Sequence, residues 1–198
     1  TTMKKLTSTL FIIFLIFSAK ALAADNEMVK RISEGEESAK ITIIAYESLT
    51  CGHCANFHKD VYPELKKDFI DKGLVKIEFR HFPLDLAAFN ASKIAQCNND
   101  GNSNILHILY SGQKKWARGK TPEEATGYLK KFLESESVNL DFEKCLSDKA
   151  IEDYVLNDRI DGVKKFEVNA TPTIIINDKK FDKALNYKNL KKYLEKLI

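Results

Sequence analysis

Two cysteines separated by two residues are the sequence's clearest candidates for chemistry. Cys51 and Cys54 enclose a Gly-His pair in the segment LTCGHCA, residues 49–55. A C-x-x-C pair can form a structural disulfide, supply two thiolates of a zinc site, or act as a redox pair that alternates between dithiol and disulfide. The spacing alone leaves all three possibilities open, so the elements around the pair have to distinguish them.

The N-terminal residues indicate an exported protein. Two lysines follow the first methionine, which we take as the natural start, and an apolar run, LFIIFLIF, covers residues 10–17. The run is followed by SAKALA, which ends in small residues. This order predicts a signal peptide over residues 1–23, cleaved before Ala24. The run is far shorter than the roughly 20 residues of a membrane span, so we expect release into a periplasm where disulfides persist.

The charge of the predicted mature chain is balanced. The full sequence has 31 Lys and Arg residues, 28 Asp and Glu residues and a formal net charge of +3. The predicted signal peptide holds three of the lysines and no acid, so the remainder is formally neutral. This balance argues against a nucleic acid or an anionic membrane as partner. The length of the remainder fits one domain, or one domain with a sizeable insertion.

The segment around the cysteine pair is typical of a strand, a helix and a second strand. Residues 40–46, KITIIAY, are β-branched and largely apolar, which predicts a buried strand. Residues 51–69 carry a helical pattern, and residues 74–82, LVKIEFRHF, predict another strand. Pro63 predicts a kink in the helix, and Gly73 predicts its end.

Only helical patterns follow, until strand patterns return near the C-terminus. Thr121, Pro122 and Glu124 are the clearest helix start, with an N-cap, a first-turn proline and an acid that closes a capping box. The predicted helices cover residues 86–97, 103–117, 121–134, 141–146 and 149–166. A strand over 173–177, a hairpin partner over 179–185 and a helix over 189–197 are predicted to complete the chain. The order is a βαβ half, an all-helical insertion of about 80 residues and a ββα half.

This layout places the cysteine pair where a strand ends and a helix begins, which favours a redox role. With Thr50 as N-cap, Cys51 lies in the first helical turn, where unpaired N–H groups and the helix dipole stabilise a thiolate. Cys54 lies on the same side of the helix, within disulfide reach. His53, between them, is expected to stabilise the thiolate further. A stabilised thiolate favours the reduced form, so the disulfide should be oxidising.

Together these features resemble the DsbA-like branch of the thioredoxin family. The resemblance is carried by ITIIAYESLTCGHCANFHKDVYPEL, by FRHFPL, by the long helical insertion and by NATPT at residues 169–173. It covers essentially the whole mature chain. It implies an α/β thioredoxin fold, with residues 24–84 and 168–198 as the thioredoxin-like domain and residues 85–167 as the all-helical insertion.

The resemblance also implies roles for residues outside the cysteine pair. Pro172 matches the family's cis-proline, which packs against the active disulfide, and Thr171 before it is expected to offer backbone contacts to an extended substrate peptide. The sequence departs from the family pattern at Ala45, where DsbA-like proteins usually carry a buried acid six residues before the first active cysteine. Glu47 follows on the same strand face. It either takes over proton transfer or is exposed at the strand end.

The two remaining cysteines are expected to be structural. We predict that Cys97 and Cys145 form a second disulfide, because two free thiols are unusual in an exported protein. The bond would close a loop of about 48 residues and contribute at most ~4 kcal/mol in the chain-entropy model. A zinc site of all four cysteines needs two ligand pairs close in sequence, and only one pair exists. We therefore expect neither a metal nor an organic cofactor.

The other histidines and the tryptophan have structural explanations. His58 lies on the apolar face of its predicted helix, so a satisfied core histidine is expected rather than a catalyst. His81 lies at the end of a strand, where loop packing explains it. His107 and Trp116 are expected in the core of the insertion.

The expected function is that of a periplasmic dithiol oxidase whose catalytic residues are Cys51, Cys54 and His53. A substrate thiolate attacks Cys51, and a second substrate cysteine resolves the mixed disulfide. Its partners would be reduced exported proteins and, by the resemblance, a DsbB-like quinone-linked membrane enzyme that reoxidises the pair. A monomer is expected, because no dimerisation segment precedes the first strand.

Two alternatives remain open at this point. The first is an isomerase or reductase with the same site, since Gly-His is also the dipeptide of protein disulfide isomerases. Those enzymes are less oxidising, with potentials of roughly −180 mV against about −120 mV for DsbA. The second alternative is a binding module or holdase whose cysteine pair is inert.

Overall fold

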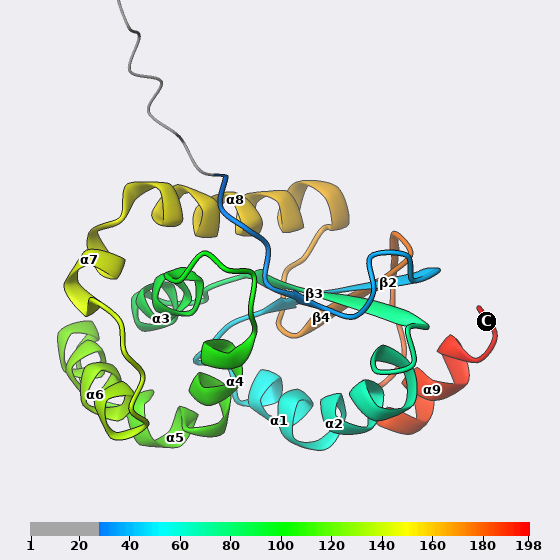
Figure 1. Ribbon diagram of the computed structural model, residues 1–198, viewed down its shortest axis with the longest axis horizontal. Helices are drawn as coiled ribbons and strands as arrows, with labels where there is room; N and C mark the ends of the chain where they lie inside the picture. The colour runs from blue at the N-terminus through cyan, green and yellow to red at the C-terminus, as the bar shows by residue number, and fades with distance from the viewer. Residues whose placement is uncertain (1–27) are drawn as a thin grey trace, which may run out of the picture.

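The computed structural model describes residues 28–198, so the predicted signal peptide lies outside the described residues. A five-stranded sheet runs through the molecule in the order β1-β3-β2-β4-β5 (Figure 1). The strands are β1 (Ser33–Glu34), β2 (Ile41–Glu47), β3 (Val75–His81), β4 (Thr173–Ile176) and β5 (Lys179–Lys180). β2 pairs in parallel with β3 and antiparallel with β4. The predicted α/β thioredoxin fold with a helical insertion is confirmed.

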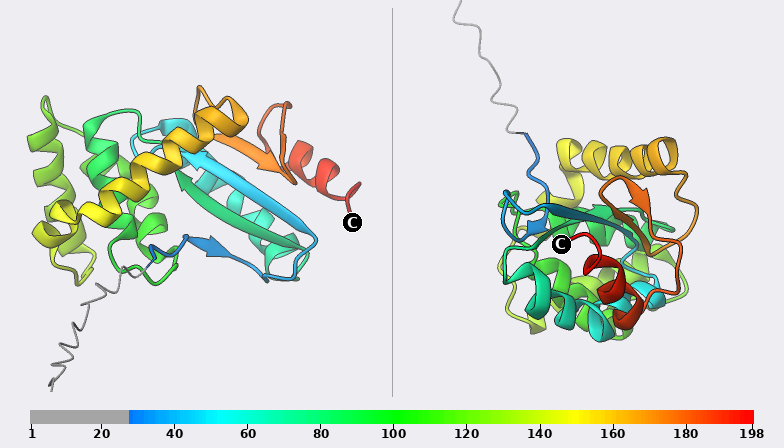
Figure 2. Two further views of the ribbon diagram at one scale, coloured as in Figure 1. Left: turned by 90° about the horizontal axis from the view of Figure 1, so that it is seen from above. Right: turned by 90° about the vertical axis from the view of Figure 1, so that its right-hand side faces the viewer.

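Helices cover both faces of the sheet because its central strands carry apolar side chains on both faces. Ile41 and Ile43 pack into the core on one face, and Tyr46 and Ile175 form a second cluster on the other. The first face is covered by α1 (Gly52–Asp60), α2 (Tyr62–Leu65) and α9 (Tyr187–Leu194), and the second by α8 (Lys149–Phe166) (Figures 1 and 2). The strand that leads to the cysteine pair is therefore held rigidly in the interior.

The helix predicted over residues 51–69 is divided at Val61. α2 follows this residue and leads into a wider π-helical segment, Lys66–Ile70. Pro63 explains the division, since it has no N–H to donate and its ring crowds the carbonyl of the residue four positions earlier. The predicted kink is present two residues before the proline, and the helical segment ends before Gly73.

Six helices connect β3 to β4, and the five that precede α8 form the end of the molecule away from α9 (Figure 1). Before α8 they are α3 (Leu86–Gln96), α4 (Asn104–Ser111), α5 (Gln113–Trp116), α6 (Pro122–Ser135) and α7 (Phe142–Ser147). The single helix predicted over residues 103–117 is broken at Gly112. A Cβ at this position would lie 1.9 Å from the ring of Phe132, so α6 approaches the corner between α4 and α5 too closely for any residue but glycine.

Capping groups explain where helices begin. The Thr121 hydroxyl accepts a hydrogen bond from the N–H of Glu124 at 3.2 Å, as predicted. The Glu124 carboxylate does not complete the predicted box, because it accepts from the N–H of Lys120 instead. Asn186 caps α9, so this helix begins at Tyr187, earlier than predicted.

Two parts of the sheet differ from the sequence prediction. The hairpin partner predicted over residues 179–185 pairs with β4 only through Lys179 and Lys180. Strand β1 was not predicted, because its two residues, Ser33 and Glu34, are too few to show a periodic pattern.

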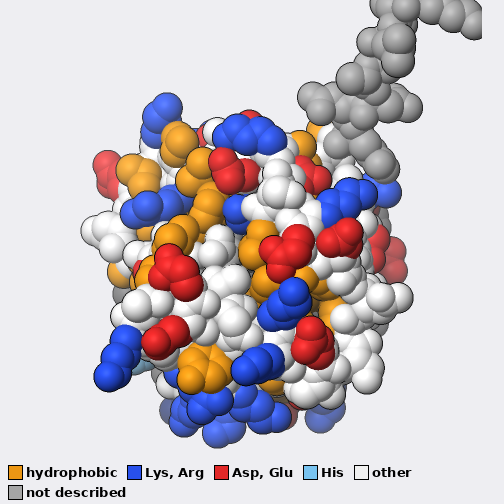
Figure 3. All heavy atoms as spheres, turned by 90° about the vertical axis from the view of Figure 1, so that its left-hand side faces the viewer, with side chains coloured by type: hydrophobic (Ala, Val, Ile, Leu, Met, Phe, Trp, Pro, Cys, Tyr) orange, Lys and Arg blue, Asp and Glu red, His pale blue; other side chains and the backbone are white. Residues whose placement is uncertain are grey.

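The helical end of the molecule presents a mixed surface. Figure 3 shows acidic and basic side chains interspersed with small hydrophobic areas, and basic side chains gathered along its lower edge. Between residues 28 and 198, no helix is long and apolar enough to cross a membrane.

Candidate active site

Cys51 and Cys54 lie at the junction of β2 and α1. Cys51 is the N-cap of α1, so the prediction that Thr50 caps this helix is wrong. The Thr50 hydroxyl instead donates a hydrogen bond to Oδ2 of Asp85 at 2.7 Å. Both cysteines are free thiols, Cys51 partly buried and Cys54 fully buried. A substrate can therefore reach the first sulfur but not the second.

The environment of Cys51 lowers the pKa of its thiol from an ordinary value of 9.0 to about 5. The largest cause is a hydrogen bond with the Cys54 thiol, which outweighs the opposing effect of burial. Thr171 and the backbone N–H groups of Cys54 and His53 stabilise the thiolate further. At neutral pH Cys51 is therefore a thiolate, the form that reacts with disulfides.

Thr171 lies next to the Cys51 sulfur. The thiol form of Cys51 can donate to the Thr171 carbonyl oxygen, which lies 3.4 Å from the sulfur. A thiolate would be repelled by that carbonyl. The buried Thr171 hydroxyl makes no hydrogen bond among the described residues, so it is free to turn toward the sulfur, and its proximity lowers the pKa of Cys51. We therefore assign the stabilisation of the thiolate to the hydroxyl.

Cys54 has the opposite electrostatic environment. Burial is the main cause that raises the pKa of its thiol, and the hydrogen bond with Cys51 and the negative charge of Glu47 add to it. A backbone hydrogen bond from Ser48 opposes this rise but does not cancel it. Cys54 therefore keeps its proton at neutral pH and donates it in a hydrogen bond to the Cys51 thiolate.

Glu47 is buried, not exposed at the strand end. It is the last residue of β2, and its Oε2 lies 2.8 Å from Nε2 of His58. Its Oε1 is also buried and has no hydrogen-bond partner within the described chain. Ala45, where the family pattern has an acid, is fully buried in the core. Of the two positions, only Glu47 brings a charge close enough to act on Cys54.

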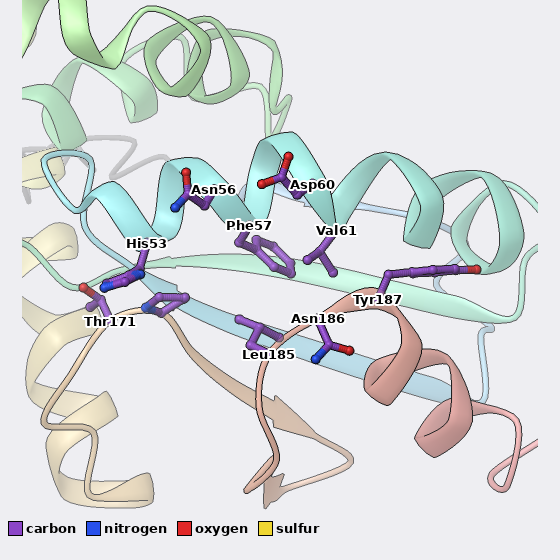
Figure 4. A pocket seen from close by; sticks show the side chains of 10 residues that line it. His53, Asn56, Phe57, Asp60, Val61, Thr171, Leu185, Asn186 and Tyr187 are labelled. Carbon is purple, nitrogen blue, oxygen red and sulfur yellow. The ribbon is translucent and has the colours of Figure 1, made fainter.

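A groove runs beside Cys51 and the loop before β4, where the Thr171–Pro172 peptide bond is cis. Its volume is about 490 Å³, and Figure 4 shows its lining between α1 and the segment that precedes α9. The lining includes His53, Phe57, Thr171, Pro172 and Leu185. The groove thus combines apolar side chains with the backbone of an irregular loop, a surface suited to an extended peptide. The His53 side chain lies on this surface, and its contact with the thiolate is made through its backbone N–H.

Two residues that lie against the cysteine pair were not identified from the sequence. The Gln113 side chain is buried and donates hydrogen bonds to the carbonyl oxygens of Leu49 and Cys51, at 2.8 and 2.9 Å. Tyr110 is buried beside the pair, and burial, the charge of Glu47 and the proximity of both cysteines raise the pKa of its hydroxyl. Both residues come from the helical insertion, so their proximity to the cysteines depends on tertiary packing. No local motif could have revealed it.

The structure agrees with the predictions for His58 and Trp116 and differs from those for His81 and His107. His58 is a buried, hydrogen-bonded histidine, and Trp116 is fully buried in the core. His81 is a buried residue of β3 that contacts Gln96, so the expectation of loop packing is wrong. His107 is not in the core, because 26% of its side chain is exposed.

The second cysteine pair is bonded. Cys97, at the end of α3, forms a disulfide with Cys145 in α7, with a Cα–Cα distance of 5.4 Å. The bond joins two helices of the insertion and leaves Cys51 and Cys54 as a separate pair.

The chain matches the family profile described as Thioredoxin over residues 27–196. It is 29% identical over 172 residues to disulfide bond formation protein D of Bacillus subtilis, covering 82% of this chain and 74% of that protein. It is 30% identical over 158 residues to a protein of Rickettsia bellii named as a protein-disulfide oxidoreductase, covering 77% of this chain and 58% of that protein. The chain spans 33% to 58% of the length of three such Rickettsia relatives.

A solved structure extends the similarity to three dimensions. Alpha-DsbA1 of Wolbachia pipientis superposes with a TM-score of 0.75 at 28% identity, over 87% of this chain and 94% of that chain. With the profile match, this similarity shows that the chain belongs to the thioredoxin family, in its DsbA-like branch.

Proposed function

We propose that the protein is a periplasmic dithiol oxidase that introduces disulfides into exported proteins through Cys51 and Cys54. The observation that carries this proposal is the contrast between the two sulfurs. Cys51 is an accessible thiolate with a pKa of about 5, and burial raises the pKa of Cys54. A stabilised thiolate favours the reduced form, which makes the disulfide a strong oxidant.

The reaction begins from the Cys51–Cys54 disulfide. A substrate thiolate attacks the accessible Cys51 sulfur, forming a mixed disulfide, and Cys54 leaves and takes up one proton. A second substrate thiolate attacks the substrate sulfur of the mixed disulfide, and Cys51 leaves as a thiolate. Two electrons pass from the substrate to the protein, one substrate disulfide forms, and Cys54 keeps one proton. The low pKa of Cys51 makes the last step fast, because thiolates of low pKa leave most readily.

The groove beside the cis peptide bond is the substrate site in this proposal. Its apolar lining can hold side chains of an unfolded segment, while backbone groups of Thr171 pair with the segment as an added strand. Recognition through the backbone suits an enzyme that has to accept many sequences. His53 borders this groove and can contact the segment near the reacting sulfur.

The remaining parts of the proposal concern the whole protein. Residues 1–23 direct export. Residues 24–84 and 168–198 form the catalytic domain, and residues 85–167 form the insertion that supplies Tyr110 and Gln113. A DsbB-like membrane enzyme would reoxidise the pair of a monomeric protein.

A transfer assay tests the proposal. The oxidised protein is mixed with a reduced, unfolded protein that regains activity only when its disulfides form. We expect rapid, stoichiometric disulfide formation by the wild type and none by Cys51→Ser. An isomerase would instead need added glutathione and would rescue substrates with wrong disulfides, while an inert binding module would leave the substrate reduced.

A further inference from the structure

Four titratable side chains from four elements form a continuous chain of polar contacts next to the cysteine pair. Oε2 of Glu47 lies 2.8 Å from Nε2 of His58, and Nδ1 of His58 lies 3.2 Å from Nδ1 of His107. Nε2 of His107 lies 2.8 Å from Oε1 of Glu34. These residues belong to β2, α1, α4 and β1. We call this set the Glu47–Glu34 chain.

The chain leads from the interior toward solvent. The side chains of Glu47 and His58 are only 3% and 5% exposed, whereas those of Glu34 and His107 are 14% and 26% exposed. His58 and His107 border a groove of about 1020 Å³ between α1 and the α4–α5 corner, on the side of α1 that faces the insertion. Water in this groove can therefore reach the outer histidine.

The three contacts require one more proton than two neutral imidazoles provide. An ionised carboxylate only accepts hydrogen bonds, and a neutral imidazole carries a single N–H. If both Nε2 atoms donate to the carboxylates, the facing Nδ1 atoms of His58 and His107 both lack a proton and repel each other. A third proton within the chain turns the 3.2 Å contact into an N–H···N hydrogen bond.

The outer end of the chain is held ionised, so the additional proton belongs to its inner part. Burial favours the neutral form of Glu34, but hydrogen bonds from His107, Ser103 and Tyr62 lower its pKa to about 2. Nζ of Lys66 lies 3.5 Å from Oε2 of Glu34 and adds a positive charge near the surface. A third proton that completes the three hydrogen bonds would therefore lie on the imidazole pair or on Glu47.

The inner end of the chain faces Cys54. Oε1 of Glu47 is buried and makes no hydrogen bond with any residue between 28 and 198, and the charge of Glu47 contributes to the raised pKa of Cys54. Tyr110 stacks on His58 at a centroid distance of 4.0 Å, which shields the chain on the side of the insertion. His81 pairs in register with Glu47 on the neighbouring strand; burial lowers the pKa of His81, and the charge of Glu47 opposes this shift.

We propose that the Glu47–Glu34 chain is a proton relay, in which His58 and His107 carry one proton between solvent and the Cys54 sulfur. The inference rests on the proposed redox function. When the disulfide is reduced, Cys54 leaves as a thiolate and receives a proton from Glu47, directly or over one water molecule. The proton of Glu47 is replaced from Nε2 of His58, which is reprotonated through His107 from water in the groove.

The relay runs in reverse when the disulfide forms again. An oxidant accepts two electrons, the Cys51–Cys54 bond forms, and the Cys54 proton leaves through the same groups. Cys51 needs no proton in either direction, because it leaves and attacks as a thiolate. Each catalytic cycle therefore moves one proton in and one proton out along the chain.

Two substitutions of the outer histidine test the relay. His107→Gln keeps an N–H that can donate to Glu34 but cannot pass a proton on. His107→Ala opens a space beside the groove that free imidazole can enter. The measurement is the single-turnover rate of reduction of the oxidised protein by dithiothreitol, in H₂O and D₂O across pH, with and without added imidazole.

We expect both variants to be reduced at least about tenfold more slowly than the wild type at neutral pH, since lost proton transfer by a positioned group has effects of this size or larger. Imidazole should restore the rate of His107→Ala and leave His107→Gln slow. The pKa of Cys51, followed by thiolate absorbance, should be unchanged in both. Wild-type rates in both variants would overturn the relay, as would a slow His107→Ala that imidazole does not restore.

The small dithiol keeps this test separate from the proposed function. Reduction by dithiothreitol requires the same protonation of Cys54 whichever protein substrate the enzyme serves. A wild type that reacts with dithiothreitol but not with unfolded proteins would contradict the proposed oxidase while leaving the relay measurable.

Discussion

Replacing Cys54 by alanine removes the hydrogen bond that contributes most to the low pKa of Cys51. In the structure the Cys54 thiol is fully buried and interacts with the Cys51 sulfur at the start of α1. The substitution leaves the Thr171 hydroxyl and the backbone N–H groups in place. We therefore expect the pKa of Cys51 to rise in Cys54→Ala, but to remain below that of an ordinary thiol.

The size of the rise follows from the strength of a charge-assisted hydrogen bond. Such a bond contributes about 1.5–3 kcal/mol. Because Cys51 is partly exposed, solvent screening places this bond at the lower end of that range. One pKa unit corresponds to about 1.4 kcal/mol, so the pKa should rise by about one unit, from about 5 to about 6.

Cys54→Ser is the matched control, since its hydroxyl is close in size to a thiol and can still donate to the thiolate. Thiolate absorbance and the rate of iodoacetamide alkylation, both measured against pH, report the pKa of Cys51 in each variant. We expect the serine variant to stay near the wild type and the alanine variant to differ from both. Equal pKa values in the two variants would show that Cys54 does not stabilise the thiolate by donating a hydrogen bond.

Three further predictions concern stability. Gly112→Ala should lower the free energy of unfolding by about 1–3 kcal/mol, because its Cβ would clash with Phe132. The control Gly127→Ala, with open space at Cβ, should raise the free energy of unfolding by up to ~1 kcal/mol. Equal denaturant midpoints of the two variants would contradict the packing argument. Joint replacement of Cys97 and Cys145 by alanine should lower the free energy of unfolding by up to ~4 kcal/mol, and an unchanged denaturant midpoint would contradict a structural role. The folded-state pKa of the active-site thiolate is depressed, so its contribution to the stability of the reduced protein is complete above the pKa of an unfolded thiol and is lost as pH falls through about 5. Denaturation of the reduced protein against pH should show this loss, and the oxidised protein, which has no thiolate, should not.

Most of the fold could be predicted because its elements carry strong local patterns. The β-branched run of β2 and the start of α6 at Thr121 are examples in which a periodic pattern or a cap determines the element. The errors arise where tertiary contacts decide. Gly112 breaks a helix because Phe132 packs against it, and Thr50 leaves its capping position to bind Asp85.

The candidate site could be predicted only in part, for the same reason. The cysteine motif and the Thr-Pro motif are local and identify two sides of the site. Glu47 could be placed on the correct strand, but its burial depends on tertiary packing that the strand pattern does not encode. His107 and Tyr110 reach the site through the packing of α4 against α1, which leaves no signal in either segment alone.

The most direct test of the proposed function is the reduction potential of the Cys51–Cys54 pair, titrated against glutathione at several pH values. A stabilised Cys51 thiolate predicts a potential of about −120 mV at neutral pH. The Cys97–Cys145 disulfide should stay oxidised throughout the titration, since structural disulfides have potentials below about −300 mV. Because only Cys54 gains a proton on reduction above pH 5, the potential should fall by about 30 mV per pH unit there. A potential near −200 mV or lower, or a slope of about 60 mV per pH unit at neutral pH, would contradict the stabilised thiolate and with it the oxidase.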